Sequence, residues 1–199
     1  MTSNKNFWDT RWQNQNTGWD LGEVSPAIKN YIDQLENKEL KVLIPGAGNA
    51  YEAEYLISRG FTNITVIDIA PTLIAQLKEK RKDTEVLTLI EGDFFEHEGQ
   101  YDLIIEQTFF CAIDPSLRDA YVDKMYKLLK PKGKLVGVLF NRDFEAGPPF
   151  GGSKQEYEKR FKKKFTINKL EECYCSYPAR QDAELWMCVS PEGRMISTY

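Results

Sequence analysis

Short apolar runs alternate along the chain with segments whose apolar positions recur at helical spacing, a pattern typical of strands joined by crossover helices. The runs are rich in Val, Ile and Leu, as expected for strands that are buried on both faces. They predict five strands, at Lys41–Ile44, Asn63–Asp68, Glu85–Glu91, Asp102–Glu106 and Lys134–Phe140. The predicted fold class is therefore α/β, with a doubly wound and mostly parallel sheet.

Helix signals fill the intervals between these strands. Tyr51–Arg59 is followed by Gly60, a common residue just after a helix C-terminus. Further helices are expected at Pro71–Lys80, Ser116–Leu129 and Lys154–Lys163. Two β-rich stretches, Phe165–Tyr174 and Glu184–Val189, are close enough in sequence to form an antiparallel edge pair. Residues 190–199 carry little pattern.

A glycine turn follows the first predicted strand and contains Gly46 and Gly48. A strand, a glycine turn and a helix N-terminus in succession let backbone approach a ligand closely and direct free N–H groups toward it. Asp68 ends the second strand, where a carboxylate is placed to bind the hydroxyls of a ribose. Asp93 and Phe94 follow the third strand and are candidates for contacts with an adenine. For Asp93, a role as a helix cap or turn residue is an equal alternative.

The glycine pattern departs from the fingerprint of nicotinamide-dependent dehydrogenases. That fingerprint has a third glycine where this chain has Tyr51, at the position where helix and strand pack closely. A small nicotinamide-dependent reductase therefore stays only as an alternative.

Length and charge narrow the remaining classes. A chain of 199 residues predicts one domain, 1–199, and a net charge of −4 with a pI near 5.3 argues against a nucleic-acid partner. No apolar run reaches membrane-spanning length and the first residues do not resemble a signal peptide, so we expect a cytoplasmic protein without membrane association. The four cysteines lack paired CxxC spacing, which predicts no metal site, and a single histidine, His97, argues against triad chemistry.

Four motifs carry a resemblance to a known family: FWDTRWQNQNTGWD at 7–20, VLIPGAGN at 42–49, YDLIIEQTFFCAIDPSLRDAY at 101–121, and GPPF with a following YE pair within 147–158. Together they resemble the thiopurine methyltransferase family of S-adenosylmethionine-dependent enzymes, and most closely its thiol and halide methyltransferase branch. The resemblance implies a Rossmann-like class I methyltransferase fold. It also implies that residues 1–36 form a cofactor-covering segment and residues 37–199 the Rossmann-like core.

The resemblance assigns expected contacts with S-adenosylmethionine. On sequence alone the N-terminal tryptophans slightly favour a hydrophobic staple for a helix. The resemblance reverses this preference and implies that they cover the cofactor. Gln107 would contact the cofactor or the acceptor, with Glu106 as the alternative polar group. The expected cofactor-binding set is Trp8, Trp12, Trp19, Gly46, Gly48, Asp68, Asp93, Phe94 and Gln107.

Two departures from related patterns bear on chemistry. Ile44 occupies the position, two residues before the first glycine, where many methyltransferases have an acid, so a contact with the methionine ammonium must come from elsewhere. In the thiopurine branch the position of Gln107 commonly holds an arginine suited to an anionic thiopurine. The expected acceptor is therefore a small thiol, sulfide, thiocyanate or halide ion. A thiopurine or aromatic thiol remains the alternative, and a non-catalytic cofactor-binding protein a remoter one.

The expected acceptor pocket is small and aromatic, and the loop at 141–153 should line or cover it. Methyl transfer from a sulfonium needs alignment and exclusion of water rather than a dedicated base, so no catalytic residue is named. Positioning candidates are Trp8, Gln107 and Tyr157, and wall candidates are Phe109, Phe110, Phe144 and Phe150. A monomer is expected.

Overall fold

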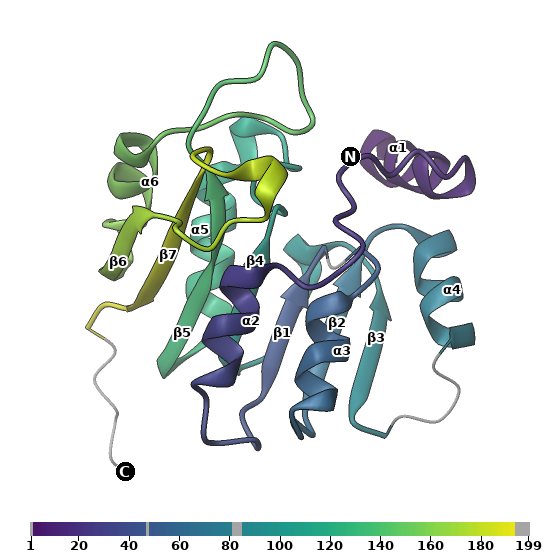
Figure 1. The fold of residues 1–199 in the computed structure, drawn as a ribbon, viewed down its shortest axis with the longest axis horizontal. Coiled ribbons are helices and arrows are strands. Elements are labelled where there is room, and N and C mark those ends of the chain that lie inside the picture. The colour runs from purple at the N-terminus through teal and green to yellow at the C-terminus, as the bar shows by residue number, and fades with distance from the viewer. Residues whose placement is uncertain (1, 47, 81–84, 194–199) are drawn as a thin grey trace.

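The computed structural model describes residues 2–46, 48–80 and 85–193, and its centre is a seven-stranded sheet in the order β3-β2-β1-β4-β5-β7-β6 (Figure 1). The strands are β1 (Val42–Pro45), β2 (Ile64–Asp68), β3 (Leu87–Glu91), β4 (Tyr101–Gln107), β5 (Leu129–Phe140), β6 (Phe165–Glu172) and β7 (Glu184–Pro191). The first five are parallel, whereas β7 pairs antiparallel with both β5 and β6. The predicted fold class, including its antiparallel C-terminal edge pair, is confirmed.

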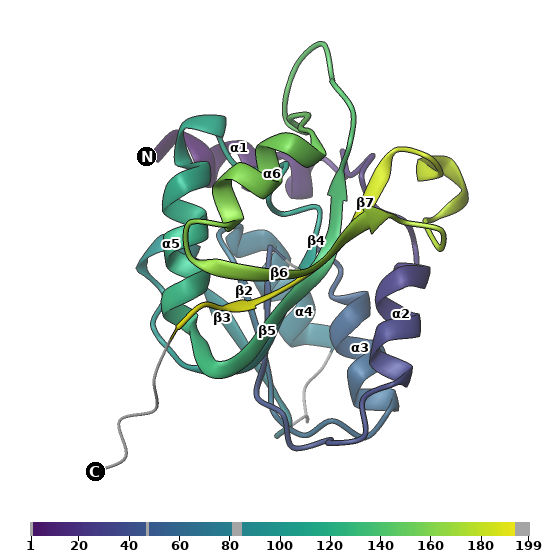
Figure 2. The same cartoon turned by 90° about the vertical axis from the view of Figure 1, so that its left-hand side faces the viewer.

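Helices cover both faces of this sheet, as Figure 2 shows for α2 and α3 on one side and α5 and α6 on the other. The helices are α1 (Thr2–Gln13), α2 (Pro26–Asp33), α3 (Tyr51–Ser58), α4 (Pro71–Lys80), α5 (Arg118–Leu128) and α6 (Lys154–Phe161). Among them, α1 lies across the carboxyl ends of the strands and contacts α4. None of the helices in the described ranges is long and apolar enough to cross a membrane.

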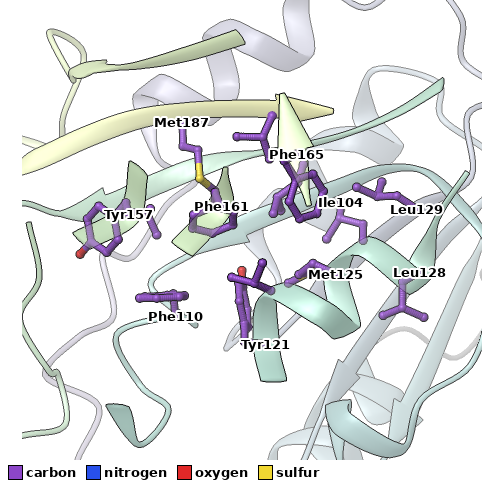
Figure 3. Close-up of a cluster of buried hydrophobic side chains, with 14 of the residues drawn as sticks. Ile104, Phe110, Tyr121, Met125, Leu128, Leu129, Tyr157, Phe161, Phe165 and Met187 are labelled. Atoms are coloured by element: carbon purple, nitrogen blue, oxygen red, sulfur yellow. The ribbon is translucent and has the colours of Figure 1, made fainter. Parts of the chain in front are cut away.

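Side chains of each inner strand alternate between two buried clusters, which explains the unbroken apolar runs in the sequence. In β1, Val42 and Ile44 pack toward α2, α3 and α4, whereas Leu43 packs toward α5 and α6. The second cluster contains the aromatic side chains of α5 and α6 that Figure 3 draws. Because both faces of each inner strand are buried, most positions are apolar, with Thr65 and Glu106 as buried polar exceptions, and only the strand ends are open to a ligand.

Two of the differences between the structure and the sequence prediction concern α2 and β5. Helix α2 was not predicted, although Ser25 followed by Pro26 is a common helix start and Ile28 and Ile32 are fully buried. Strand β5 begins at Leu129 rather than at Lys134, because the segment around Pro131 continues as an irregular part of the strand. There Tyr101 pairs with Leu129 and Leu103 with Lys134, so the bulge accommodates a residue that cannot donate a ladder hydrogen bond.

The C-terminal end and the loop after β5 complete the fold. Residues 190 and 191 belong to β7, and residues 194–199 lie outside the described part of the chain. The loop at 141–153 closes on itself through the N–H of Gly152, which donates to the carbonyl of Arg142 at 3.0 Å. A Cβ at Gly151 would collide with the same carbonyl, so this close approach requires glycine. The loop therefore has a defined shape beside the strand ends.

Candidate active site

A cavity of about 480 Å³ opens at the carboxyl ends of the strands. The N-terminal segment borders it on one side and the loop at 141–153 on the other, and Figure 1 shows both rising above this edge of the sheet. The volume lies within the range of small-molecule and cofactor sites. Parallel α/β sheets bind their ligands at this edge.

The glycine turn forms the floor of the cavity. Gly46 has a φ of +59° and its N–H donates to the carbonyl of Ile67 at 2.8 Å. A Cβ at this position would collide with the ring of Phe109, so both the backbone conformation and the close contact require glycine. Gly48 has a φ of +51°, and the nearest side-chain atom to its missing Cβ belongs to Trp12, at 4.0 Å. Aromatic rings thus approach the turn from two sides.

Two carboxylates border the cavity at the ends of β2 and β3. Asp68 accepts a hydrogen bond from the N–H of Ala70 at 2.9 Å. Burial raises the pKa of Asp68 to about 6, against the opposite effect of nearby backbone N–H groups that include that of Gly48. Asp93 accepts from the N–H of Phe95 at 2.8 Å and thereby caps the short 3-10 helix at 94–96. The capping role foreseen for Asp93 is therefore present, and the residue lines the cavity as well.

The N-terminal segment is fastened across this half of the cavity. Asp9 accepts a hydrogen bond from the N–H of Thr72, at the start of α4, at 2.8 Å, and Lys5 forms an ion pair with Glu91 at 2.7 Å. The rings of Trp8 and Trp12 each pack edge-on against Trp19, with centroids 5.3 and 6.0 Å apart, and all three tryptophans line the cavity. The segment is therefore a wall of the site.

Hydrogen bonds from other elements hold residues 19–22 of this segment in place. Asp20 accepts hydrogen bonds from the side-chain amide of Asn49, from the N–H of Gly22 at 2.9 Å and from the hydroxyl of Tyr51 at 3.4 Å. Arg180 donates to the carbonyl of Trp19 at 2.7 Å. The segment is thus held from the glycine turn on one side and from the chain before β7 on the other.

The residues that follow β4 form the opposite half of the cavity. Gln107 lines it, and its Oε1 is buried with no hydrogen-bond partner among the described residues. Thr108 adopts a φ of +60°, a strained conformation for a β-branched residue and one found preferentially at functional sites. An unpaired buried acceptor beside a strained residue indicates a place where a ligand completes the hydrogen bonding.

Glu106, the alternative polar group at this point, faces away from the cavity. Its fully buried carboxylate accepts from the N–H groups of Phe109 at 2.7 Å and Phe110 at 3.1 Å, and from the hydroxyl of Tyr121 at 2.6 Å. Burial raises the pKa of Glu106 to about 7. The structure therefore places Gln107, and not Glu106, at the cavity wall.

The aromatic candidates divide between the cavity and the core. Phe109 and Phe144 line the cavity, whereas Phe110 and Tyr157 belong to the buried cluster in Figure 3. The Tyr157 hydroxyl donates to the carbonyl of Phe140, and Phe150 is not among the lining residues. Tyr157 lies on the buried face of α6, which turns its hydroxyl away from the site. Lining residues that the sequence did not name as site residues include Cys111, Ile113, Phe140 and Arg180. Arg142, Pro148 and Pro149 also line the cavity and lie in the loop that was expected to border it.

Comparison with known proteins identifies the family of this chain. Residues 3–187 match the family described as Thiopurine S-methyltransferase (TPMT). The chain belongs to this family. It is therefore an S-adenosylmethionine-dependent methyltransferase.

The names of related proteins specify different methyl acceptors. "Probable thiol methyltransferase 2" of Arabidopsis thaliana is 32% identical over 158 residues, which cover 76% of this chain and 70% of the relative. "Thiocyanate methyltransferase 1" of Brassica oleracea is 28% identical over 156 residues, covering 76% and 69%. "Thiopurine S-methyltransferase" of Shewanella woodyi is 30% identical over 173 residues, covering 74% and 77%.

Solved structures with low sequence identity show the same fold. The 1,6-didemethyltoxoflavin-N1-methyltransferase of Burkholderia thailandensis superposes with a TM-score of 0.72 at 16% identity, over 94% of this chain and 86% of the other. The enzyme's own cavity fits the methyl donor in chemical terms, because it combines a glycine turn, two strand-end carboxylates and the unpaired Oε1 of Gln107.

Proposed function

We propose that this methyltransferase acts on small, soft anions: thiolates and bisulfide, thiocyanate, or halides such as iodide. The observation that carries the proposal is the charge of the cavity half formed after β4. Its charged lining residues are Arg142, which is exposed, and Arg180, which also pairs with Glu184 at 3.5 Å and donates to the carbonyl of Trp19. No acid is among the described residues that line this half. The other lining side chains there are mostly aromatic or apolar: Phe109, Cys111, Ala112, Ile113, Phe140, Phe144, Pro148, Pro149, Ala179 and Ala183.

The same half suits a weakly hydrated anion. An arginine in an apolar wall attracts negative charge, whereas an apolar wall penalises ions that hold their water tightly. Soft anions lose their hydration at smaller cost than hard ones, so they would reach the reacting carbon in preference. The likeness to thiol and thiocyanate methyltransferases supports this substrate class. The 30% identity to a thiopurine methyltransferase supports an aromatic thiol as the second candidate.

In the donor half, the proposed roles follow the positions of the side chains. Asp68 would bind the ribose hydroxyls, and Asp93 with Phe94 would hold the adenine. The glycine turn would receive the amino-acid part of the donor, which the rings of Trp8, Trp12 and Trp19 cover. Gln107 would use its unpaired Oε1 at the junction of the two halves.

The bound donor supplies a methyl group on a sulfonium, which is a good leaving group. The protein's share is to align the acceptor with that methyl group and to exclude water, and the rings of Phe109 and Phe144 are placed to do both. No base is required from the described lining residues. His97 hydrogen-bonds the hydroxyl of Tyr101 at 2.8 Å outside the cavity. For thiol acceptors, the positive charge of Arg142 and Arg180 would favour the thiolate.

A panel of acceptors tests the proposal. Purified enzyme is given labelled S-adenosylmethionine with iodide, bisulfide, thiocyanate or an aromatic thiol, and methylated product is measured against acceptor concentration. We expect saturation with at least one small anion and a kcat/KM for it that exceeds that for the aromatic thiol. A higher kcat/KM for the aromatic thiol would support the second candidate, and tight donor binding without product from any acceptor would point to a non-catalytic protein.

A further inference from the structure

Glu52 is a buried carboxylate beside the glycine turn that the roles above do not use. It is the second residue of α3, it lines the cavity, and only 4% of its surface is exposed. Carboxylates are rarely buried to this extent without a cation or several hydrogen bonds. The position of Glu52 therefore requires an explanation.

The described neighbours of Glu52 do not supply a counter-ion. The backbone N–H groups of Glu52 itself and of Ser25 donate hydrogen bonds to the carboxylate. The positive charge of Arg180 is favourable and the negative charge of Asp20 unfavourable. No cationic side chain in the described ranges forms a salt bridge with Glu52, because Arg180 instead binds the carbonyl of Trp19 and approaches Glu184 at 3.5 Å. Burial dominates this balance and raises the pKa of Glu52 to about 7. The carboxylate is thus held in place with room for a positive partner.

The other acids on this side of the cavity are less suited to that partner. Asp20 is occupied by hydrogen bonds from Asn49, Gly22 and Tyr51, and Glu23 is exposed to solvent. The end of β1, where a carboxylate could reach the same space, carries the apolar Ile44. Glu52 remains as the buried carboxylate next to the turn.

We infer that Glu52 binds the α-ammonium group of the methionine part of the donor. The amino-acid part is a zwitterion, so it needs a site for negative charge next to one for positive charge. The N–H groups at the start of α3, apart from that of Glu52, favour its carboxylate, and Glu52, in the first turn of the same helix, would take the ammonium. In this chain the ammonium contact would thus come from the helix after the glycine turn rather than from the end of β1.

The inference rests on the identity of the donor and not on that of the acceptor, so it can fail independently of the proposed substrate class. The test is calorimetric binding of three nucleosides to the whole protein. S-adenosylhomocysteine carries the amino group, its deaminated analogue lacks only that group, and 5′-methylthioadenosine lacks the entire amino-acid part. Wild-type protein should bind S-adenosylhomocysteine about 10- to 100-fold more tightly than the deaminated analogue, the range expected for a hydrogen bond to a charged group.

The variant Glu52→Gln keeps an acceptor oxygen for Ser25 but removes the charge. It should lose about 10- to 100-fold in affinity for S-adenosylhomocysteine and stay within about twofold of wild type for the other two nucleosides. Glu54→Gln removes the same charge from the exposed side of the same helical turn, at a residue that does not line the cavity, and should bind all three as wild type does. The inference is overturned if wild type does not distinguish S-adenosylhomocysteine from its deaminated analogue, a result that needs no folded variant. It is also overturned if Glu52→Gln weakens all three nucleosides alike or none of them.

Discussion

Removal of the Glu106 carboxylate should both destabilise the protein and loosen the wall of the active site. The carboxylate is the shared acceptor for the N–H groups of Phe109 and Phe110 and for the hydroxyl of Tyr121. In Glu106→Ala these donors lose their partner, and each unsatisfied buried donor costs about 1–3 kcal/mol. Because the chain relaxes and water enters in part, we expect a total loss of roughly 3–5 kcal/mol in the free energy of unfolding, as for other broken buried charge networks.

Urea denaturation followed by fluorescence measures this loss, and Tyr121→Phe is the matched control. That variant removes one donor and leaves the acceptor with two others, so it should cost only about 1 kcal/mol. The Phe109 ring, which covers Gly46, loses its backbone anchor only in Glu106→Ala. The alanine variant should therefore also lose donor affinity under conditions where it is still folded. Equal urea midpoints for Glu106→Ala and wild type would refute the reasoning.

The pH dependence of the same stability gives a second measurement. The pKa of Glu106 is about 7 in the folded protein and near 4.5 when the chain is unfolded, so the folded state binds its proton more tightly. Its contribution to stability is fully present below about pH 4.5 and is lost as the pH rises through about 7. Glu106→Gln cannot titrate, so the difference between wild type and this variant should change by about 3 kcal/mol between pH 4.5 and 8. A constant difference across that range would show that Glu106 stays charged when buried.

Three further variants test the site. Asp68→Asn should weaken S-adenosylhomocysteine by about 1–3 kcal/mol in calorimetry through loss of a ribose contact, and unchanged affinity would remove Asp68 from the site. Arg142→Gln should lower kcat/KM for thiocyanate or bisulfide with little change in donor affinity, and an unchanged kcat/KM would leave Arg180 as the relevant cation. Asp9→Ala removes the hydrogen bond from the N–H of Thr72, so limited proteolysis at residues 14–17 should be faster than in wild type. Bound donor should slow this cleavage in wild type. Equal cleavage rates with and without donor would contradict a covering role for the N-terminal segment.

The parts of the site that sequence could predict are those fixed by local chemistry. A glycine at positive φ after a buried strand, as at Gly46, is a requirement of the turn itself, and Asp68 follows from the point where an apolar run stops. The positive φ of Gly46 and the strand-end position of Asp68 each depend on only a few neighbouring residues. The five parallel strands and the antiparallel edge pair follow from similar local patterns combined with the rules of parallel sheets.

The parts that sequence could not predict depend on direction in space. Phe109 and Phe110 are adjacent in sequence, yet Phe109 covers the glycine turn and Phe110 packs in the core. The Glu106 carboxylate fixes these directions because it accepts hydrogen bonds from both backbone N–H groups. Arg180 lies in a short 3-10 turn without periodicity, and β7 brings it to the cavity by inserting between β5 and β6. Such placements arise from tertiary packing and leave no mark in the local pattern.

The distribution of charge along the cavity connects the two proposals. The half that includes the glycine turn is lined by five acids, Asp20, Glu23, Glu52, Asp68 and Asp93, against the single cation Arg11, whereas Arg142 and Arg180 line the half after β4. A donor with a sulfonium and an ammonium is drawn to the first half, and an anionic acceptor to the second. Transfer of the methyl group combines an anion with a cation, so charge is lost on the way to the transition state. Apolar rings such as Phe109, near where the two halves meet, then disfavour the separated charges of the reactants more than the transition state, and this difference accelerates the reaction. An acid introduced in the second half, as in Ala112→Asp, would repel the anionic acceptor. It would also add a charge where the charges of the reactants should cancel.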